Sequence, residues 1–181
     1  MAGGGDASGS PTTPIWLLDV DGVLNAVTLD VDRSAWPDWT TGTAQTSGRS
    51  YRITFSPDVM AGIRDLHDRG LVEIRWLTTW SRDANADLRR LLGLPEFPVV
   101  GSPGGSAVWW KLPLAQEVAR EGRPLIWTDD ELGYSPDALD WLNGLDQPAL
   151  AIAPEPTVGL RREHLDRILA FATEQASLSD R

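Results

Sequence analysis

The sequence contains no cysteine, which excludes disulfide bonds and metal sites built on thiolates. It also lacks any apolar stretch near the roughly 18 residues that a membrane-spanning helix needs. Its first residues, MAGGGDASGSPTTP, have neither the basic region nor the apolar core of a signal peptide, and their composition predicts a flexible tail over residues 1–13. These absences predict a cytoplasmic protein with no membrane partner.

An excess of positive charge is also missing. The formal net charge is −10 and the sequence pI is about 4.5. Proteins that bind along a nucleic acid need a basic stripe facing the phosphates, so we expect no extended nucleic-acid surface here. A nucleic-acid end could still be bound at one local site. The length of 181 residues, with 41% hydrophobic and 23% charged residues, is typical of one globular domain.

Strands and helices are predicted to alternate along the chain. Short apolar runs predict buried parallel strands at 14–20, 71–78, 123–130 and 148–153. Apolar periodicity and capping residues predict helices at 56–70, 81–94, 110–122, 135–144 and 159–176. This alternation predicts an α/β fold, a Rossmann-like three-layer sandwich with a central parallel sheet. We expect the domain to span residues 14–176, with a C-terminal tail at 177–181.

The segment between about residues 25 and 55 predicts a small hairpin flap. Its second strand is expected at 49–55, where polar and apolar residues alternate. Fewer than forty residues separate Asp19 from Ser56, and about thirty separate Thr79 from Lys111. Neither interval has room for a folded cap, so we expect no large cap domain and an open site.

Chemically active side chains follow the predicted strands. They are Asp19 and Asp21 after the first strand, Thr78 and Thr79 after the second, Asp129 and Asp130 after the strand at 123–130, and Lys111 at the start of the helix before that strand. In parallel sheets the ligand crevice lies beyond the carboxyl ends of the strands, so these groups are expected to converge. Several carboxylates in one crevice need compensation by a divalent cation, by the Lys111 ammonium or by helix N-termini.

These segments resemble, in order, the four motifs of the haloacid-dehalogenase superfamily. DVDGVLN resembles the first, RWLTT the second, Lys111 the third and IWTDDE the fourth. The resemblance covers roughly residues 14–172. More narrowly, WLTTW, LGLP and GRPLIWTDDE resemble an actinobacterial branch related to phosphatase domains of RNA-repair proteins. The resemblance implies a Mg²⁺-dependent phosphatase, a phosphoric monoester hydrolase that forms an aspartyl-phosphate.

The resemblance also implies roles for the individual residues. Asp19 would be the nucleophile, because carboxylates form covalent phosphoryl intermediates. Asp21 would protonate the leaving oxygen and then deprotonate the attacking water. Thr78 would hydrogen-bond a phosphoryl oxygen, and Lys111 would neutralise charge in the transition state.

The remaining predicted site residues bind substrate or metal. Gly22 permits a tight turn at the phosphate, the Thr79 amide assists Thr78, and Trp80 either stacks on a base or sugar or packs in the crevice. Mg²⁺ would be held by the Asp19 carboxylate, the Asp21 carbonyl and one residue of the Asp129–Asp130 pair, with waters completing the shell. Which of that pair ligates directly is left open, and the sequence indicates no oligomeric state.

An open site favours a bulky substrate: a nucleotide, a nucleic-acid end or another large phosphorylated molecule. Two alternatives come from other classes. A dehalogenase would use the same nucleophile on carbon, but such relatives generally lack the second acid, which is Asp21 here. A catalytically inactive binding module would usually have lost one motif residue, and none is missing.

Overall fold

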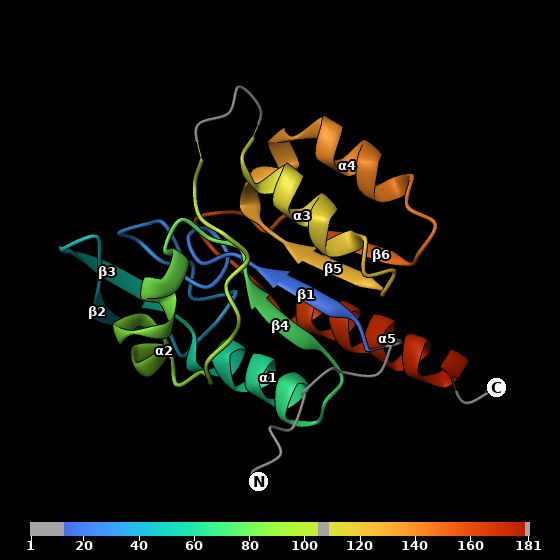
Figure 1. The fold of residues 1–181 in the computed structure, drawn as a ribbon. Coiled ribbons are helices and arrows are strands. Elements are labelled where there is room, and N and C mark those ends of the chain that lie inside the picture. Colours follow the sequence, from blue (N-terminus) through green and yellow to red (C-terminus); the bar gives the residue numbers. More distant parts are fainter. Residues whose placement is uncertain (1–12, 105–108, 180–181) are drawn as a thin grey trace, which may run out of the picture.

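The computed structural model describes residues 13–104 and 109–179, and its core is a four-stranded parallel sheet (Figure 1). The strands run in the spatial order β4–β1–β5–β6. Their bounds are β1 Ile15–Leu18, β4 Glu73–Trp76, β5 Leu125–Thr128 and β6 Ala149–Ile152. Each lies within one of the predicted apolar runs, so the α/β class with a central parallel sheet is confirmed. The expected tail at 1–13 lies outside the described residues except for Thr13.

Helices cover both faces of this sheet (Figure 1). Helices α1 (Pro57–Asp68) and α5 (Arg162–Ser179) lie on one face, and α3 (Lys111–Ala119) and α4 (Pro136–Asn143) lie on the other. The central strand β1 contributes side chains to the hydrophobic cores on both faces of the sheet, because successive side chains of a strand point to opposite faces. Trp16 and Leu18 join the core under α1 and α5, whereas Ile15 and Leu17 join the core under α3 and α4. The result is a three-layer, Rossmann-like arrangement.

Two predicted helices differ from those observed. The helix expected at 81–94 is divided into a 3₁₀ turn, η1 (Ser81–Asn85), and a short helix, α2 (Asp87–Leu92). Ala86 separates them because its ψ of −116° is not helical. The last helix runs from Arg162 to Ser179 rather than from 159 to 176. It cannot begin at Gly159, whose φ is +76°, and it continues through residues 177–179, which were expected in the tail.

Helix α1 begins as predicted. The Ser56 hydroxyl accepts a hydrogen bond from the Val59 amide at 3.3 Å, and Pro57 occupies the first turn, where its missing amide proton costs nothing. A second 3₁₀ turn, η2 (Asp130–Tyr134), follows β5 directly. No helix within residues 13–104 and 109–179 combines the length and apolar character needed to cross a membrane.

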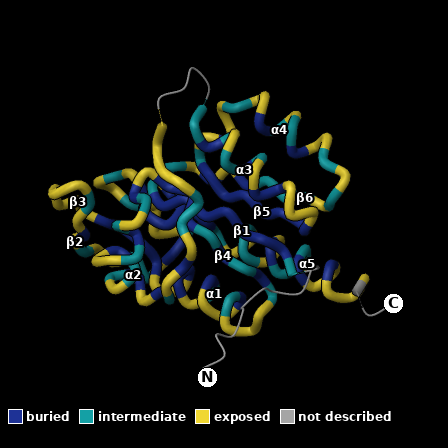
Figure 2. Tube along the Cα trace, in the orientation of Figure 1, coloured by how far each residue is buried: buried dark blue, intermediate teal, exposed yellow. Residues whose placement is uncertain are grey.

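A separate antiparallel hairpin lies between β1 and α1 in sequence. Its strands are β2 (Thr40–Thr46) and β3 (Arg49–Phe55), joined by a tight turn at Ser47 and Gly48. The Asp83 carboxylate of η1 accepts hydrogen bonds from the Thr46 hydroxyl and the Ser47 amide, each at 2.9 Å. The hairpin tip is exposed, whereas its base joins the core (Figure 2). The hairpin is therefore anchored to η1 at its tip and to the sheet core at its base.

Candidate functional site

Three carboxylates meet at the carboxyl end of the parallel sheet. Strand β1 pairs with β5 so that Leu18 lies opposite Thr128. The next residues are Asp19 and Asp129, so the register itself sets these two acids side by side. Oxygens of Asp19, Asp129 and Asp130 lie within 4.8 Å of one another. Both Asp19 and Asp129 are buried, whereas Asp130 is only partly so. The predicted convergence of these acids is confirmed.

Lys111, the only lysine of the sequence, lies among these acids. Its Nζ is 2.7 Å from Asp129 Oδ2, 3.0 Å from Asp19 Oδ2 and 3.6 Å from Glu131 Oε2. The side chain is 2% exposed, so the ammonium is nearly removed from water. Lys111 begins α3 and thus reaches the cluster from the helix layer, as the sequence predicted. The Lys111 ammonium therefore faces the buried carboxylates of Asp19 and Asp129 and the more exposed carboxylate of Glu131.

The charges in this cluster shift one another's protonation. Burial raises the pKa of Asp19 from 3.8 to about 6, although the Lys111 ammonium and hydrogen bonds from Val20 and Thr78 oppose the rise. Burial, followed by the Asp19 charge, raises the pKa of Asp129 well above its ordinary value. For Lys111, burial alone favours the neutral amine, but the two carboxylates outweigh it and raise its pKa. In the absence of a further cation the cluster therefore favours holding an additional proton.

The donor set suits a divalent cation bound by oxygen. In an octahedral Mg²⁺ site with bonds of about 2.0–2.1 Å, neighbouring ligand oxygens are about 3 Å apart and opposite ones about 4 Å apart. The ligand oxygens of Asp19, Asp129 and Asp130 lie within 4.8 Å of one another, a limit close to the largest separation in such a site. Burial raises the pKa values of Asp19 and Asp129, and a bound cation would lower them again by stabilising the ionised carboxylates. These three acids therefore fit the expected metal.

Gly22 is required at its position by Asp130. Its φ is +73°, a conformation that favours glycine. A Cβ at residue 22 would overlap the Asp130 carboxyl group, with the Oδ2 atom 2.7 Å away. The glycine thus lets the loop after β1 approach the Asp130 side chain, which a larger residue at this position would displace.

Asp21 is oriented by hydrogen bonds to both of its carboxylate oxygens. Asn25 Nδ2 donates to Oδ1 at 2.7 Å, and Trp80 Nε1 donates to Oδ2 at 2.9 Å. The Asn25 side-chain oxygen in turn accepts from the Thr54 amide of β3 at 2.9 Å. Asp21 is therefore tied at once to the second motif through Trp80 and to the hairpin through Asn25. It adds no side-chain oxygen to the cluster of the other three acids, consistent with the expectation that only its carbonyl ligates.

The other predicted site residues take different places. Thr78 is buried and hydrogen-bonds the Asp19 carboxylate. Thr79 is exposed and lines a cavity of about 230 Å³ with Asp21 and Trp80. Trp80 is 3% exposed, so in this structure it is a hydrogen-bond donor to Asp21 rather than an open stacking surface.

Two residues at the site, Asn25 and Glu131, were not among the predicted site residues. Asn25 donates a hydrogen bond to Asp21. The sequence offered one indication of this role, because Asn25 is a polar residue that directly follows the short apolar run after Gly22. Glu131 accepts a hydrogen bond from Trp109 Nε1 at 2.8 Å and lies near Lys111. Trp109 also stacks on Trp127 with ring centroids 5.1 Å apart, so its ring packs against the core as well as donating this hydrogen bond.

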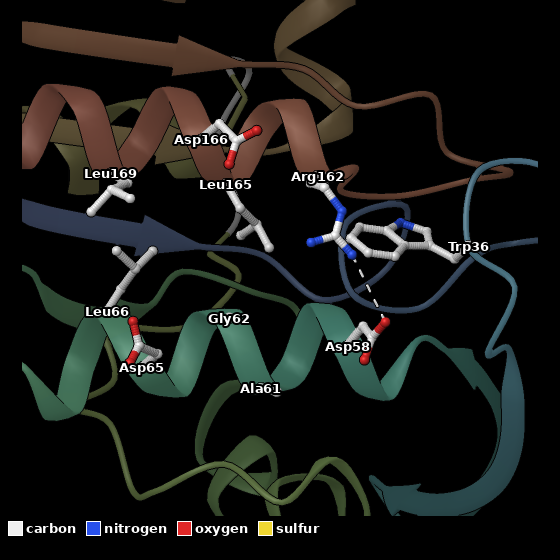
Figure 3. A pocket seen from close by; sticks show the side chains of 10 residues that line it. All are labelled: Trp36, Asp58, Ala61, Gly62, Asp65, Leu66, Arg162, Leu165, Asp166 and Leu169. Atoms are coloured by element: carbon white, nitrogen blue, oxygen red, sulfur yellow. Dashed lines mark ion pairs between the residues drawn. The ribbon is translucent and has the colours of Figure 1, made fainter.

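A cavity of about 410 Å³ between α1 and α5 lies apart from these residues (Figure 3). It contains none of the predicted site residues. Arg162 lies over the Trp36 ring at 5.5 Å and is 3.9 Å from Asp58.

Comparison with family models, with curated proteins and with solved structures finds no match, so the interpretation of the site depends on its geometry and on the motif resemblance.

Proposed function

We propose that this chain is a Mg²⁺-dependent phosphohydrolase of the haloacid-dehalogenase type, which cleaves phosphomonoesters through an aspartyl-phosphate. The observation that carries the proposal is the position of Lys111 between Asp19 and Asp129, with Asp130 in the same cluster. Buried ion clusters are weak sources of stability, because desolvation offsets much of the attraction. A catalytic role explains this arrangement better than a structural one.

Asp19 attacks phosphorus as the bond from phosphorus to the leaving oxygen breaks. It is suited to this role because Val20 and Thr78 hold its carboxylate in one orientation. Asp21 gives its proton to the leaving oxygen and later takes one from the water that releases phosphate from Asp19. Its two hydrogen bonds, from Asn25 and Trp80, keep the carboxyl group aimed in one direction.

Lys111 and Thr78 stabilise the negative charge that develops on the phosphoryl oxygens. Both are preorganised, since Lys111 is fixed by its ion pairs and Thr78 is buried at the end of β4. Mg²⁺, when bound by Asp19, Asp129, Asp130 and the Asp21 carbonyl, would supply Lewis-acid neutralisation of the phosphoryl charge.

The β2–β3 hairpin acts as a small flap beside this site. In the described part of the chain it is the only structured insertion between the loop after β1 and helix α1. A site bordered by a hairpin rather than by a domain admits a bulky phosphorylated substrate, such as a nucleotide, a nucleic-acid end or another large phosphomonoester. The net charge of −10 favours substrates that bind at this one site over extended nucleic-acid binding.

A phosphatase assay in the presence of Mg²⁺ tests the proposal. It measures phosphate release from p-nitrophenyl phosphate, nucleotides, phosphorylated oligonucleotides, sugar phosphates and phosphopeptides. Asp19→Asn should reduce turnover by at least about 10³-fold, because the amide keeps the shape but not the nucleophilicity. Asp140→Asn, an identical change on the exposed face of α4, is the matched control. Hydrolysis by Asp19→Asn near the parent rate would contradict the covalent mechanism.

A second variant tests the intermediate directly. Asp21→Asn should slow alkyl phosphates far more than p-nitrophenyl phosphate, whose leaving group departs without protonation. The aspartyl-phosphate should then accumulate because the attacking water has lost its base. Mass spectrometry after an acid quench should find an added phosphoryl group on the peptide containing Asp19. Absence of hydrolysis of every ester by the parent protein would support the binding-module alternative instead.

A further inference from the structure

A cavity of about 460 Å³ lies between the loop at residues 25–29 and strand β3, with Asp21 on its wall. Its other principal lining residues are Ala26, Val27, Leu29, Tyr51 and Arg52. A smaller cavity, of about 230 Å³, shares Asp21 and Tyr51 with it and also contains Thr79. The smaller cavity is also lined by Thr46 and Ser47 of the hairpin tip, so both cavities border the hairpin, and Asp21 and Tyr51 contribute to both.

Hydrogen bonds to the main chain fix the walls of the larger cavity. The Ala26 amide donates to the Thr54 carbonyl at 2.8 Å, and the Thr54 amide donates to Asn25 Oδ1 at 2.9 Å. The Val27 amide donates to the Pro156 carbonyl at 2.8 Å. The loop is thus bound to β3 on one side and to the segment after β6 on the other. A ligand would meet a formed cavity rather than one that must first fold.

Exposed apolar side chains gather around this cavity. Among the described residues, the exposed large hydrophobic side chains are Val27, Leu29, Tyr51, Tyr134 and Leu178. The first three of these line the cavity, and Leu29 is 86% exposed. Grouped, exposed apolar residues are typical of a ligand-binding surface, whereas single ones are ordinary.

Besides the Asp21 carboxyl group, the lining of the cavity contains one cationic side chain, Arg52. Arg52 is exposed on β3, and within residues 13–104 and 109–179 it forms no ion pair that would neutralise it. In a chain of net charge −10, an exposed guanidinium in the lining of a cavity favours an anionic group of a ligand.

We propose that this cavity binds the leaving group of the phosphomonoester, and that this leaving group carries a flat aromatic ring followed by an anionic group. This inference depends on the proposed function, because it places the leaving oxygen at Asp21. The ring lies against Val27, Leu29 and Tyr51, and the anionic group lies at Arg52. When the bond from phosphorus to oxygen breaks, the proton of Asp21 passes to that oxygen and the product alcohol remains in the cavity.

Benzyl phosphates provide a test in which the leaving group's reactivity stays nearly constant. 4-Carboxybenzyl phosphate carries the anionic group, and 4-carbamoylbenzyl phosphate is its uncharged isostere, with a methylene insulating the reacting oxygen in both. The parent protein should prefer the carboxylate by about tenfold in kcat/KM, the size of one charge-assisted contact in a partly exposed site. Arg52→Gln should reduce this preference to about onefold, because kcat/KM for the carboxylate ester loses the contribution of the guanidinium.

Arg49→Gln is the matched control, because Arg49 lies on the same strand, is exposed and does not line the cavity. It should keep the tenfold preference. Equal kcat/KM values for the two esters in the parent protein, or equal losses in Arg49→Gln and Arg52→Gln, would overturn the leaving-group site while the hydrolysis itself still supported the proposed function. No hydrolysis of either ester or of p-nitrophenyl phosphate would overturn both.

Discussion

Replacing Asp19 by asparagine should stabilise the metal-free protein at alkaline pH although it removes the proposed nucleophile. In the metal-free cluster the Asp19 carboxyl has a pKa of about 6, against 3.8 ordinarily, mainly because it is buried. A carboxyl whose pKa is higher in the folded state favours folding fully below about pH 4 and loses that contribution as the pH rises through 6. Above that pH, the ionised carboxylate lowers the free energy of unfolding, whereas an asparagine carries no charge and has no such effect.

The magnitude follows from the pKa difference. Each pKa unit corresponds to about 1.4 kcal/mol, so ionised Asp19 costs about 3 kcal/mol of folding free energy at pH 8, with the attraction of Lys111 already included. Loss of this charge also relieves Asp129, whose pKa is raised partly by Asp19. For a domain of this size, about 3 kcal/mol corresponds to roughly 6–12 °C in Tm.

Thermal unfolding followed by circular dichroism in EDTA provides the assay. Asp19→Asn should unfold at a higher temperature than the parent at pH 8, and the difference should shrink towards pH 4. With Mg²⁺ at about 100 times its Kd the parent gains about 2.7 kcal/mol, which reduces or reverses the difference. Asp140→Asn, on the exposed surface of α4, controls for the amide itself. A metal-free Asp19→Asn protein less stable than the parent at pH 8 would refute the inference that the buried, ionised Asp19 carboxylate destabilises the fold.

Three further predictions concern the loop, the acid and the metal. Gly22→Ala should weaken Mg²⁺ binding measured by calorimetry, because the added Cβ displaces Asp130. Gly48→Ala is the control, since Gly48 has the same φ of +73° but open space around it. This variant should show only the backbone strain of about 1–2 kcal/mol. Trp80→Phe should reduce kcat about tenfold on alkyl phosphates and less on p-nitrophenyl phosphate, whereas Trp39→Phe, which loses an indole hydrogen bond to a surface carbonyl, should change neither. Replacing Mg²⁺ by Ca²⁺ should retain binding but support little turnover, because Ca²⁺ takes more ligands at longer distances and can engage Asp19 in bidentate fashion; equal turnover with both ions would argue against Asp19 as the nucleophile.

The positions of the acids could be predicted because they depend on local patterns and one general rule. An apolar run ending in Asp19, and another ending in Asp129, identify two buried strands, and parallel strands bring their carboxyl ends to the same edge. Lys111 was found by its place before a helix. Each of these inferences needs only sequence neighbours and the handedness of strand–helix–strand connections.

The contacts around Asp21 could not be predicted in the same way. Trp80 is 59 residues from Asp21 in the chain, and whether its indole would donate to this carboxylate or face the crevice depends on the orientation of β4 relative to β1. The break at Ala86 was also missed, because residues 81–94 carry helical periodicity, whereas in the fold α2 packs against strand β2 of the hairpin. Contacts set by packing between distant segments leave little trace in a local pattern.

The hydrophobic core and the acidic site are coupled through the register of β1. Trp16 and Leu18 face one core, Ile15 and Leu17 face the other, and a shift of one residue would turn each pair towards the wrong helices. The same register sets Asp19 beside Asp129, so their repulsion cannot be relieved by sliding the strand without exposing buried tryptophan and leucine. A fully buried side chain of this size contributes about 1.5–3 kcal/mol, and several share this constraint. The core can therefore hold the acids together against the cost of about 3 kcal/mol that burial of ionised Asp19 imposes. A bound cation would offset the repulsion between the two carboxylates.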